Sequence, residues 1–127
     1  MRLKKALADI KQFGKERGWE PYHTTKNVII SLSAEAGELL SLVEWMTDAQ
    51  VEEALKNPDF RKAVEDETSD VLHHILNLSN KLGVDPLDVF AKKFENSRQR
   101  FPVEKTKDFD PVAWHIKKIR EKKEVRL

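Results

Sequence analysis

Residues 28–46 read VIISLSAEAGELLSLVEWM, in which apolar side chains return every three or four positions. This spacing follows the roughly 3.6-residue period of an α-helix and predicts a helix that buries one face. That face carries Val28, Leu32, Glu35, Leu39, Leu42 and Met46. Glu35 therefore places a carboxylate within a face that a helix normally fills with apolar side chains.

A second predicted helix, at residues 60–82, repeats this arrangement. Its apolar stripe consists of Val64, Glu67, Val71, Ile75, Leu78 and Leu82. Glu38 follows Glu35 by three positions, and Asp70 follows Glu67 by the same interval. Residues three apart lie on the same side of a helix, so each of the two helices carries a pair of neighbouring carboxylates.

Helix-starting and helix-ending residues divide the rest of the chain. The predicted helices run from Leu3 to near Gly18, Thr25 to about Met46, Val51 to Lys56, Phe60 to about Leu82, Leu87 to about Arg100, and onward from Pro111. Either Thr47 or Asp48 is expected to cap the short helix, and Asp59 to open the one after it. We expect an all-α bundle of four main helices at residues 1–108, followed by a basic helical extension or solvated tail at residues 109–127.

The composition excludes several classes of function. The 127 residues carry 23 Lys and Arg against 22 Asp and Glu, a balance that argues against a general nucleic-acid or membrane binder. Residues 115–127 are the exception to this charge balance. They carry six basic side chains, Arg126 among them, and two acidic ones. The absence of cysteine excludes disulfides and thiolate metal sites. The amino terminus lacks an apolar signal core, and no apolar run reaches about 18 residues, so we expect a cytoplasmic protein without a membrane span.

Four carboxylates near a helix interface require compensation, because an unpaired buried charge costs several kcal/mol. Divalent cations such as Mg²⁺ prefer carboxylate oxygens and share their remaining positions with water and phosphate. The acids therefore indicate a metal site and a phosphate ester substrate. Gly37, inside the first acidic pair, leaves room for a neighbouring helix or a ligand to approach the backbone.

Other interpretations of the acids remain open at this point. Each acidic motif alone is common on the solvated face of a charged helix. A non-catalytic helical bundle that binds a basic partner through its acidic faces is one alternative. A ferritin-like di-metal bundle is another, suggested by Asp70-x-x-His73, but such bundles carry a carboxylate-x-x-His pair on each of two helices and this chain has one.

The motifs resemble the MazG-like and dCTP pyrophosphatase-like branch of the all-α nucleoside triphosphate pyrophosphohydrolases. The resemblance covers about residues 5–107 and rests on residues 13–20, 23–27, 35–39, 44–45, 67–72 and 100–103. It implies a homodimer or dimer of dimers that uses Mg²⁺, with Mn²⁺ as a substitute. It also implies hydrolysis of a nucleoside triphosphate, such as dCTP or a modified pyrimidine, to the monophosphate and pyrophosphate.

The same resemblance suggests roles for individual residues. Glu35, Glu38, Glu67 and Asp70 are implied to be catalytic metal ligands, with Glu38 alternatively orienting or deprotonating the attacking water. The implied substrate-binding residues are His23, Lys26, Asn27, Trp45, His74, Lys92, Asn96 and Arg100, with Lys93 as a further phosphate candidate. Phe13, Trp19 and Tyr22 are expected as walls of a base pocket.

Each substrate-binding residue also has a structural interpretation. Trp45 is also interpretable as a core residue, His23 as a helix-capping loop residue, and His74 as an ordinary half-buried histidine. The lysines and the arginine are also interpretable as solvated surface cations. The family commonly has Tyr where His74 stands, and its Asn lies one position closer to the aromatic-Pro pair, so either Asn96 or Ser97 fills that role.

Overall fold

The computed structural model describes residues 2–125, and Met1, Arg126 and Leu127 lie outside the described residues. Within residues 2–125 the chain forms only helices and no strand, which confirms the all-α prediction. The helices are α1 (Leu3–Glu16), α2 (Thr25–Ser41), α3 (Asp48–Ala54), α4 (Pro58–Leu82), α5 (Pro86–Arg100), α6 (Val103–Thr106) and α7 (Pro111–Val125). The chain divides into two compact units between Asp88 and Val89, which we term the N-terminal and C-terminal units. The predicted domain boundary at residue 108 stays a prediction.

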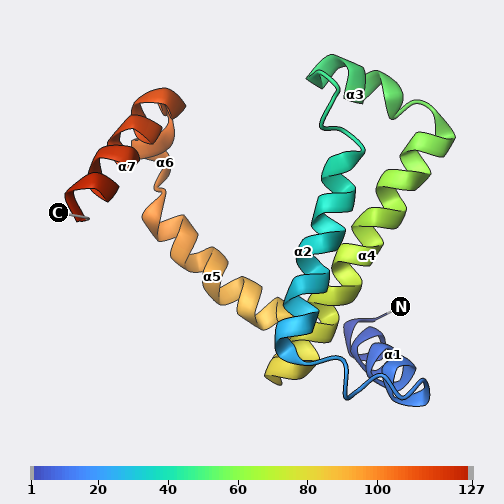
Figure 1. Ribbon diagram of the computed structural model, residues 1–127. Coiled ribbons are helices and arrows are strands. Elements are labelled where there is room, and N and C mark those ends of the chain that lie inside the picture. Colours follow the sequence, from blue (N-terminus) through green and yellow to red (C-terminus); the bar gives the residue numbers. More distant parts are fainter. Residues whose placement is uncertain (1, 126–127) are drawn as a thin grey trace. The chain divides into compact units, whose positions relative to one another are not determined.

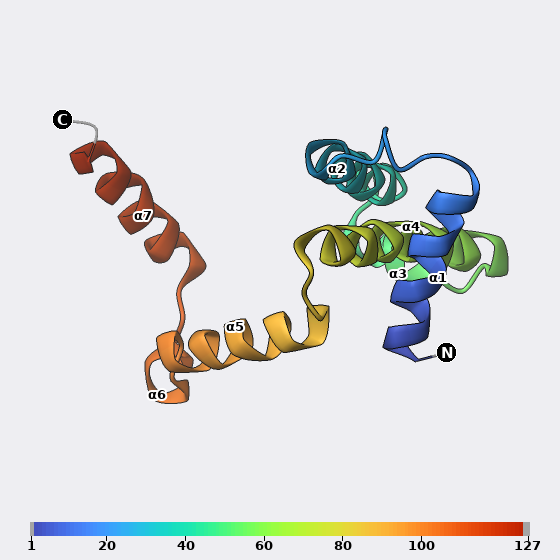
Figure 2. The ribbon, with the colours of Figure 1, turned by 90° about the horizontal axis from the view of Figure 1, so that it is seen from below.

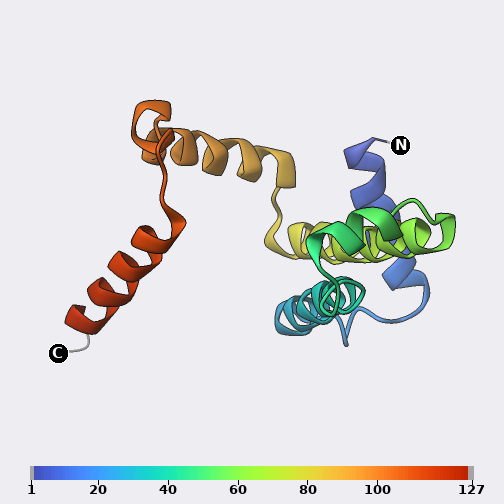
Figure 3. The same ribbon diagram turned by 90° about the horizontal axis from the view of Figure 1, so that it is seen from above.

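The N-terminal unit is built around a helical hairpin. α2 and α4 pack against each other and run in opposite directions, with α3 at the end where they are joined (Figure 1). α1 packs on α4 and crosses it toward the end of the hairpin away from α3 (Figure 2). The loop after α1 then leads to the start of α2 (Figure 3). α4 is therefore the central helix of this unit.

Local hydrogen bonds explain where most helices begin and end. The Thr24 hydroxyl accepts a hydrogen bond from the Asn27 backbone N–H at 3.2 Å and caps α2. Asn57, rather than the predicted Asp59, caps α4, because its Oδ1 accepts from the backbone N–H of Asp59 at 2.9 Å while Pro58 needs no partner. Gly83 ends α4 in the left-handed conformation, at φ +65°, which agrees with the predicted end of this helix at about Leu82.

The predicted end of the second helix near Met46 is wrong, since α2 stops at Ser41. The backbone N–H groups of Val43 and Met46 bond to carbonyls three residues back, which tightens the chain into turns. Thr47 then begins α3 with a capping box, in which it exchanges hydrogen bonds with Gln50. Thr47 is one of the two residues expected to cap the short helix, and the turns at residues 42–45 separate this cap from the end of α2.

The predicted apolar stripe is confirmed within α2 for Val28, Leu32, Glu35 and Leu39, which are buried or half-buried, led by Val28 at 2% exposure. Leu42 and Met46 are also half-buried but lie in the turns after α2. The stripe of α4 is wrong toward its end. Ile75 and Leu82 are exposed, whereas Leu76 and Asn77 are buried. The second half of α4 is covered by both α1 and α2, so its buried surface is broader than a single stripe and shifts around the helix.

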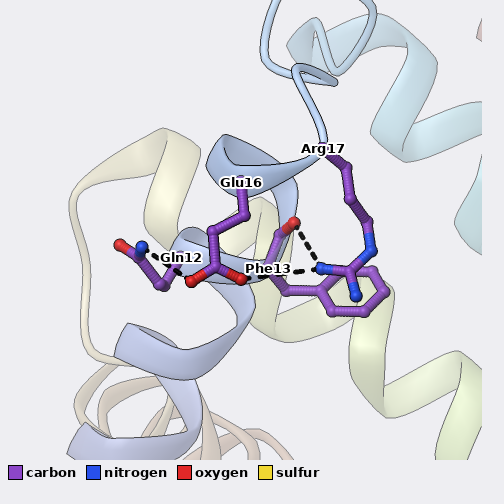
Figure 4. A network of polar contacts seen from close by, with 4 residues as sticks. All are labelled: Gln12, Phe13, Glu16 and Arg17. Atoms are coloured by element: carbon purple, nitrogen blue, oxygen red, sulfur yellow. Dashed lines mark hydrogen bonds and ion pairs between the residues drawn. The ribbon is translucent and has the colours of Figure 1, made fainter.

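Residues near the end of α1 form a small polar network (Figure 4). The Arg17 side chain donates to the Phe13 carbonyl oxygen at 3.1 Å, and its guanidinium lies 3.7 Å from the centre of the Phe13 ring. Gln12 donates to Glu16 at 2.9 Å. The Phe13 ring also meets Trp19 edge to face, at 5.5 Å between ring centres. The Phe13 ring therefore contacts both the Arg17 guanidinium and the Trp19 ring of the loop after α1.

The C-terminal unit contains α6, α7 and most of α5. The Asp110 Oδ1 accepts from the Val112 N–H at 2.9 Å, so α7 begins at the predicted Asp110-Pro111. Between α5 and α7 the chain forms the short helix α6, which the sequence did not predict. The described side chains of this unit are exposed or half-buried. Across residues 2–125, no helix combines the length and the apolar character needed to cross a bilayer.

Candidate metal centre

Three of the four predicted carboxylates lie together between α2 and α4. Glu35 of α2 and Glu67 and Asp70 of α4 each offer one oxygen atom, and these oxygens all lie within 4.8 Å of one another. Glu35 and Glu67 are half-buried, and Asp70 is exposed. The two helices of the hairpin therefore create one acidic centre with a side open to solvent.

Glu38 is exposed and is not part of this three-oxygen group. It is nevertheless close enough for its charge to raise the pKa of Glu67. The expectation that a neighbouring helix approaches Gly37 is wrong, because a side chain built there would have no described protein atom within 4 Å. Approach of a ligand at Gly37 stays a prediction.

Among the described residues, the centre concentrates negative charge without a Lys or Arg partner. Burial raises the pKa of Glu67, and the charges of Asp70, Glu35 and Glu38 raise it further. The Glu67 Oε2 atom is buried and has no hydrogen-bond partner. Within residues 2–125, no Lys or Arg nitrogen lies within 4 Å of the oxygens of these acids. An oxygen ligand set with an unsatisfied buried member fits a hard divalent cation.

Two histidines of α4 border the acids. The Nε2 atom of His74 lies 3.9 Å from the Oε1 atom of Glu35. The His74 ring meets the His73 ring edge to face at 5.2 Å, and His73 in turn meets Phe13 at 6.2 Å. Burial lowers the pKa of His73, and the neighbouring His74 lowers it further. In the sequence, His73 is a candidate only for a ferritin-like di-metal site. The structure places it between the acidic centre and α1.

The remaining predicted residues of the N-terminal unit lie around the start and the end of α2. The His23 ring lies 5.7 Å from the Trp19 ring, and Thr24 rather than His23 caps the helix. Asn27 donates its side-chain amide to the Tyr22 carbonyl oxygen at 2.9 Å, and Lys26 is exposed beside it. These contacts hold the loop before α2.

Trp45 lies in the turn after α2 and is 90% exposed. Its interpretation as a core residue is therefore wrong. Tyr22, another expected wall of a base pocket, is 72% exposed. Stacking of a base on Trp45 stays a prediction, and its exposed ring is available for such a contact.

Four predicted phosphate-binding positions lie on α5 in the C-terminal unit. Lys92, Lys93 and Asn96 are exposed. The Arg100 guanidinium lies 5.3 Å from the centre of the Phe101 ring. The Ser97 hydroxyl donates to the Lys93 carbonyl oxygen at 3.1 Å, within its own helix. The contribution of these residues to substrate binding stays a prediction.

Fold and site together define an all-α protein with a three-carboxylate centre suited to a divalent cation. No model of a known protein family matches the sequence. The chain is 36% identical over 92 residues to dCTP pyrophosphatase 1 of Rattus norvegicus and 37% identical to that of Homo sapiens. Each alignment covers 72% of this chain and 54% of the relative, so the chain spans about half the length of these curated relatives.

This chain also matches a solved structure, and it covers a larger share of that protein than of the curated relatives. A pyrophosphatase from Archaeoglobus fulgidus superposes with a TM-score of 0.73 and 31% identity, over 78% of this chain and 91% of that one. The chain belongs to the MazG-like, dCTP pyrophosphatase-like family of all-α proteins.

Proposed function

We propose that this protein is a Mg²⁺-dependent nucleoside triphosphate pyrophosphohydrolase. It converts a deoxynucleoside triphosphate to the monophosphate and pyrophosphate and thereby removes that nucleotide from the cellular pool. The observation that carries the proposal is the convergence of Glu35, Glu67 and Asp70 within 4.8 Å in a member of this family.

Glu35, Glu67 and Asp70 would hold the metal, because their oxygens form the compact acidic centre. A Mg²⁺ ion held by these residues would supply positive charge to offset the triphosphate and would lower the pKa of a nearby water. Glu38, one turn beyond Glu35 and exposed, orients the attacking water or accepts its proton. Water attacks the α-phosphorus as its bond to pyrophosphate breaks, so no protein nucleophile is required.

The substrate is dCTP or a modified pyrimidine triphosphate. The name of the curated relatives, dCTP pyrophosphatase 1, supports this assignment. The exposed Trp45 ring offers a stacking surface for a base, and His23 lies beside Trp19 at the start of α2. Lys26, Lys92 and Arg100 are the proposed phosphate contacts, since each carries a cation at an exposed position.

The protein assembles as a homodimer or homotetramer. Among the described residues, Val28 and Leu76 are the buried large apolar side chains, whereas many other large apolar side chains are exposed. These include Ile30, Leu40, Leu72, Phe90 and Phe94. Exposed apolar surface of this extent is typical of subunit interfaces. Sedimentation equilibrium tests the assembly, and a monomer at micromolar concentration would contradict it.

Product analysis tests the activity. The protein is incubated with Mg²⁺ and each of a panel of ordinary and modified triphosphates, and the phosphorus-containing products are separated. Monophosphate plus pyrophosphate is the expected result, with the highest rate for a pyrimidine deoxynucleotide. Diphosphate plus orthophosphate would show attack at the γ-phosphorus and contradict the proposed reaction.

A further inference from the structure

His74 is placed to act on the acidic centre from the α4 side. Its Nε2 atom lies 3.9 Å from the Oε1 atom of Glu35, and its side chain is 21% exposed. The other ring nitrogen, Nδ1, is buried and has no hydrogen-bond partner. The two nitrogens of this ring therefore have different surroundings, and only Nε2 is close to a carboxylate oxygen of the centre.

This difference determines which nitrogen carries the proton in the neutral ring. A neutral imidazole has one N–H donor and one acceptor nitrogen. A proton on Nδ1 would leave a buried donor unsatisfied, which is rare in folded proteins and costs more than an unsatisfied acceptor. The proton therefore belongs on Nε2, directed toward Glu35. A nitrogen that carries a proton cannot ligate a cation.

We propose that His74 is a positioning residue for Glu35: its Nε2–H donates a hydrogen bond to the Glu35 carboxylate and holds it in the orientation that binds the cation. The inference rests on the proposed function of the acidic centre. The 3.9 Å separation exceeds hydrogen-bond length, so the proposed bond requires the Glu35 side chain to rotate toward His74 when a cation binds. Partners that hydrogen-bond to metal ligands commonly raise metal affinity about 10- to 100-fold.

The test measures cation binding without substrate. Mn²⁺ alone is titrated into the full chain, and bound ion is followed by electron paramagnetic resonance, with Mg²⁺ as a competitor. His74→Leu removes the donor, His74→Gln keeps an N–H at a similar distance from the backbone, and His73→Leu is the matched control on the adjacent ring. Circular dichroism checks that each variant folds, and His74→Phe replaces His74→Leu if the latter does not.

We expect His74→Leu to bind Mn²⁺ about 10- to 100-fold more weakly than wild type. We expect His74→Gln to recover most of that loss, His73→Leu to bind like wild type, and the ratio of Mn²⁺ to Mg²⁺ affinity to stay constant. Wild-type affinity in His74→Leu would overturn the inference and leave the proposed function standing. A large change in the ratio would also overturn it, because it would make His74 a direct ligand. No binding by wild type would instead overturn the proposed function together with the inference.

Discussion

Asn80 of α4 donates its side-chain amide to the carbonyl oxygen of Leu7 in α1, at 2.9 Å. Among the described residues, it is the one side-chain hydrogen bond that joins two helices far apart in the sequence. Asn80 is half-buried, next to the buried Ser79. The bond therefore fixes α1 against the central helix at the end of the hairpin away from α3.

Replacing Asn80 should loosen this contact. We expect Asn80→Ala to lower the free energy of unfolding by about 1–3 kcal/mol, because the Leu7 carbonyl loses its side-chain partner. Urea denaturation followed by circular dichroism measures the change. Gln12→Ala, which removes an exposed hydrogen bond within α1, is the control and should change stability by less than about 0.5 kcal/mol. Equal effects in the two variants would show that the bond between α1 and α4 contributes nothing.

Much of the N-terminal unit could be predicted from the sequence because its signals are local. The stripe of α2 and the end of α4 at Gly83 each depend on neighbouring residues. The start of α7 at Asp110, in the C-terminal unit, is local in the same way. The broad buried surface around Leu76 could not be predicted in this way, because it depends on α1 and α2 covering α4 together. The early end of α2 could not be predicted either, because the apolar spacing continues through Leu42 and Met46 although the backbone there forms turns.

The same distinction holds for the candidate site. Helical spacing predicted which acids share a face, and three of the four lie together. Spacing within one helix carries no information on which side chains of the next helix lie opposite. Only the packing of α2 on α4 shows that His74 lies near Glu35. The same packing shows that Glu38 lies outside the three-oxygen group.

Two glycines of the hairpin should respond in opposite directions. Gly83 has φ +65°, so Gly83→Ala places a side chain in the left-handed region and should cost about 1–2 kcal/mol of stability. Gly37 is helical with no described atom near its absent side chain, so Gly37→Ala should add about 0.5–1 kcal/mol through helix propensity. Thermal melts of both variants make the comparison. Destabilisation by Gly37→Ala comparable to that of Gly83→Ala would contradict it.

The stability of the metal-free protein should depend on pH through Glu67. Its pKa is raised in the fold by burial and by Asp70, Glu35 and Glu38, so the folded state holds this proton more tightly than the unfolded state. The resulting stability is present below the unfolded pKa and is lost as pH rises through the folded pKa.

Glu67→Gln should therefore melt at a higher temperature than wild type near pH 7 in the presence of a chelator. The difference should disappear toward pH 4, and saturating Mg²⁺ should reverse the order by stabilising wild type alone. Melting curves at several pH values, with and without Mg²⁺, provide the measurement. If Glu67→Gln were less stable than wild type in chelator at pH 7, repulsion among the carboxylates of the centre would not destabilise the metal-free fold.

Glu38 should be separable from the metal ligands. Because it lies outside the three-oxygen group, Glu38→Gln should retain Mn²⁺ affinity while its turnover falls by about 100-fold or more, as expected when a group that orients or deprotonates water is lost. Ion binding and pyrophosphate release are measured on the same preparation. Parallel losses of binding and turnover would make Glu38 a metal ligand, and unchanged turnover would remove it from the site.

The most direct measurement is calorimetric titration of Mg²⁺ and Mn²⁺ into wild type, Asp70→Asn and Asp66→Asn. Asp66 lies one turn before Asp70 on α4 but pairs with Lys62 at 2.6 Å and faces solvent, so it is a matched control. If Glu35, Glu67 and Asp70 hold a cation, Asp66→Asn will bind it like wild type and Asp70→Asn will bind it at least about 10-fold more weakly, with unchanged helical content. Equal binding by all three proteins, or no binding by wild type, would contradict the metal centre.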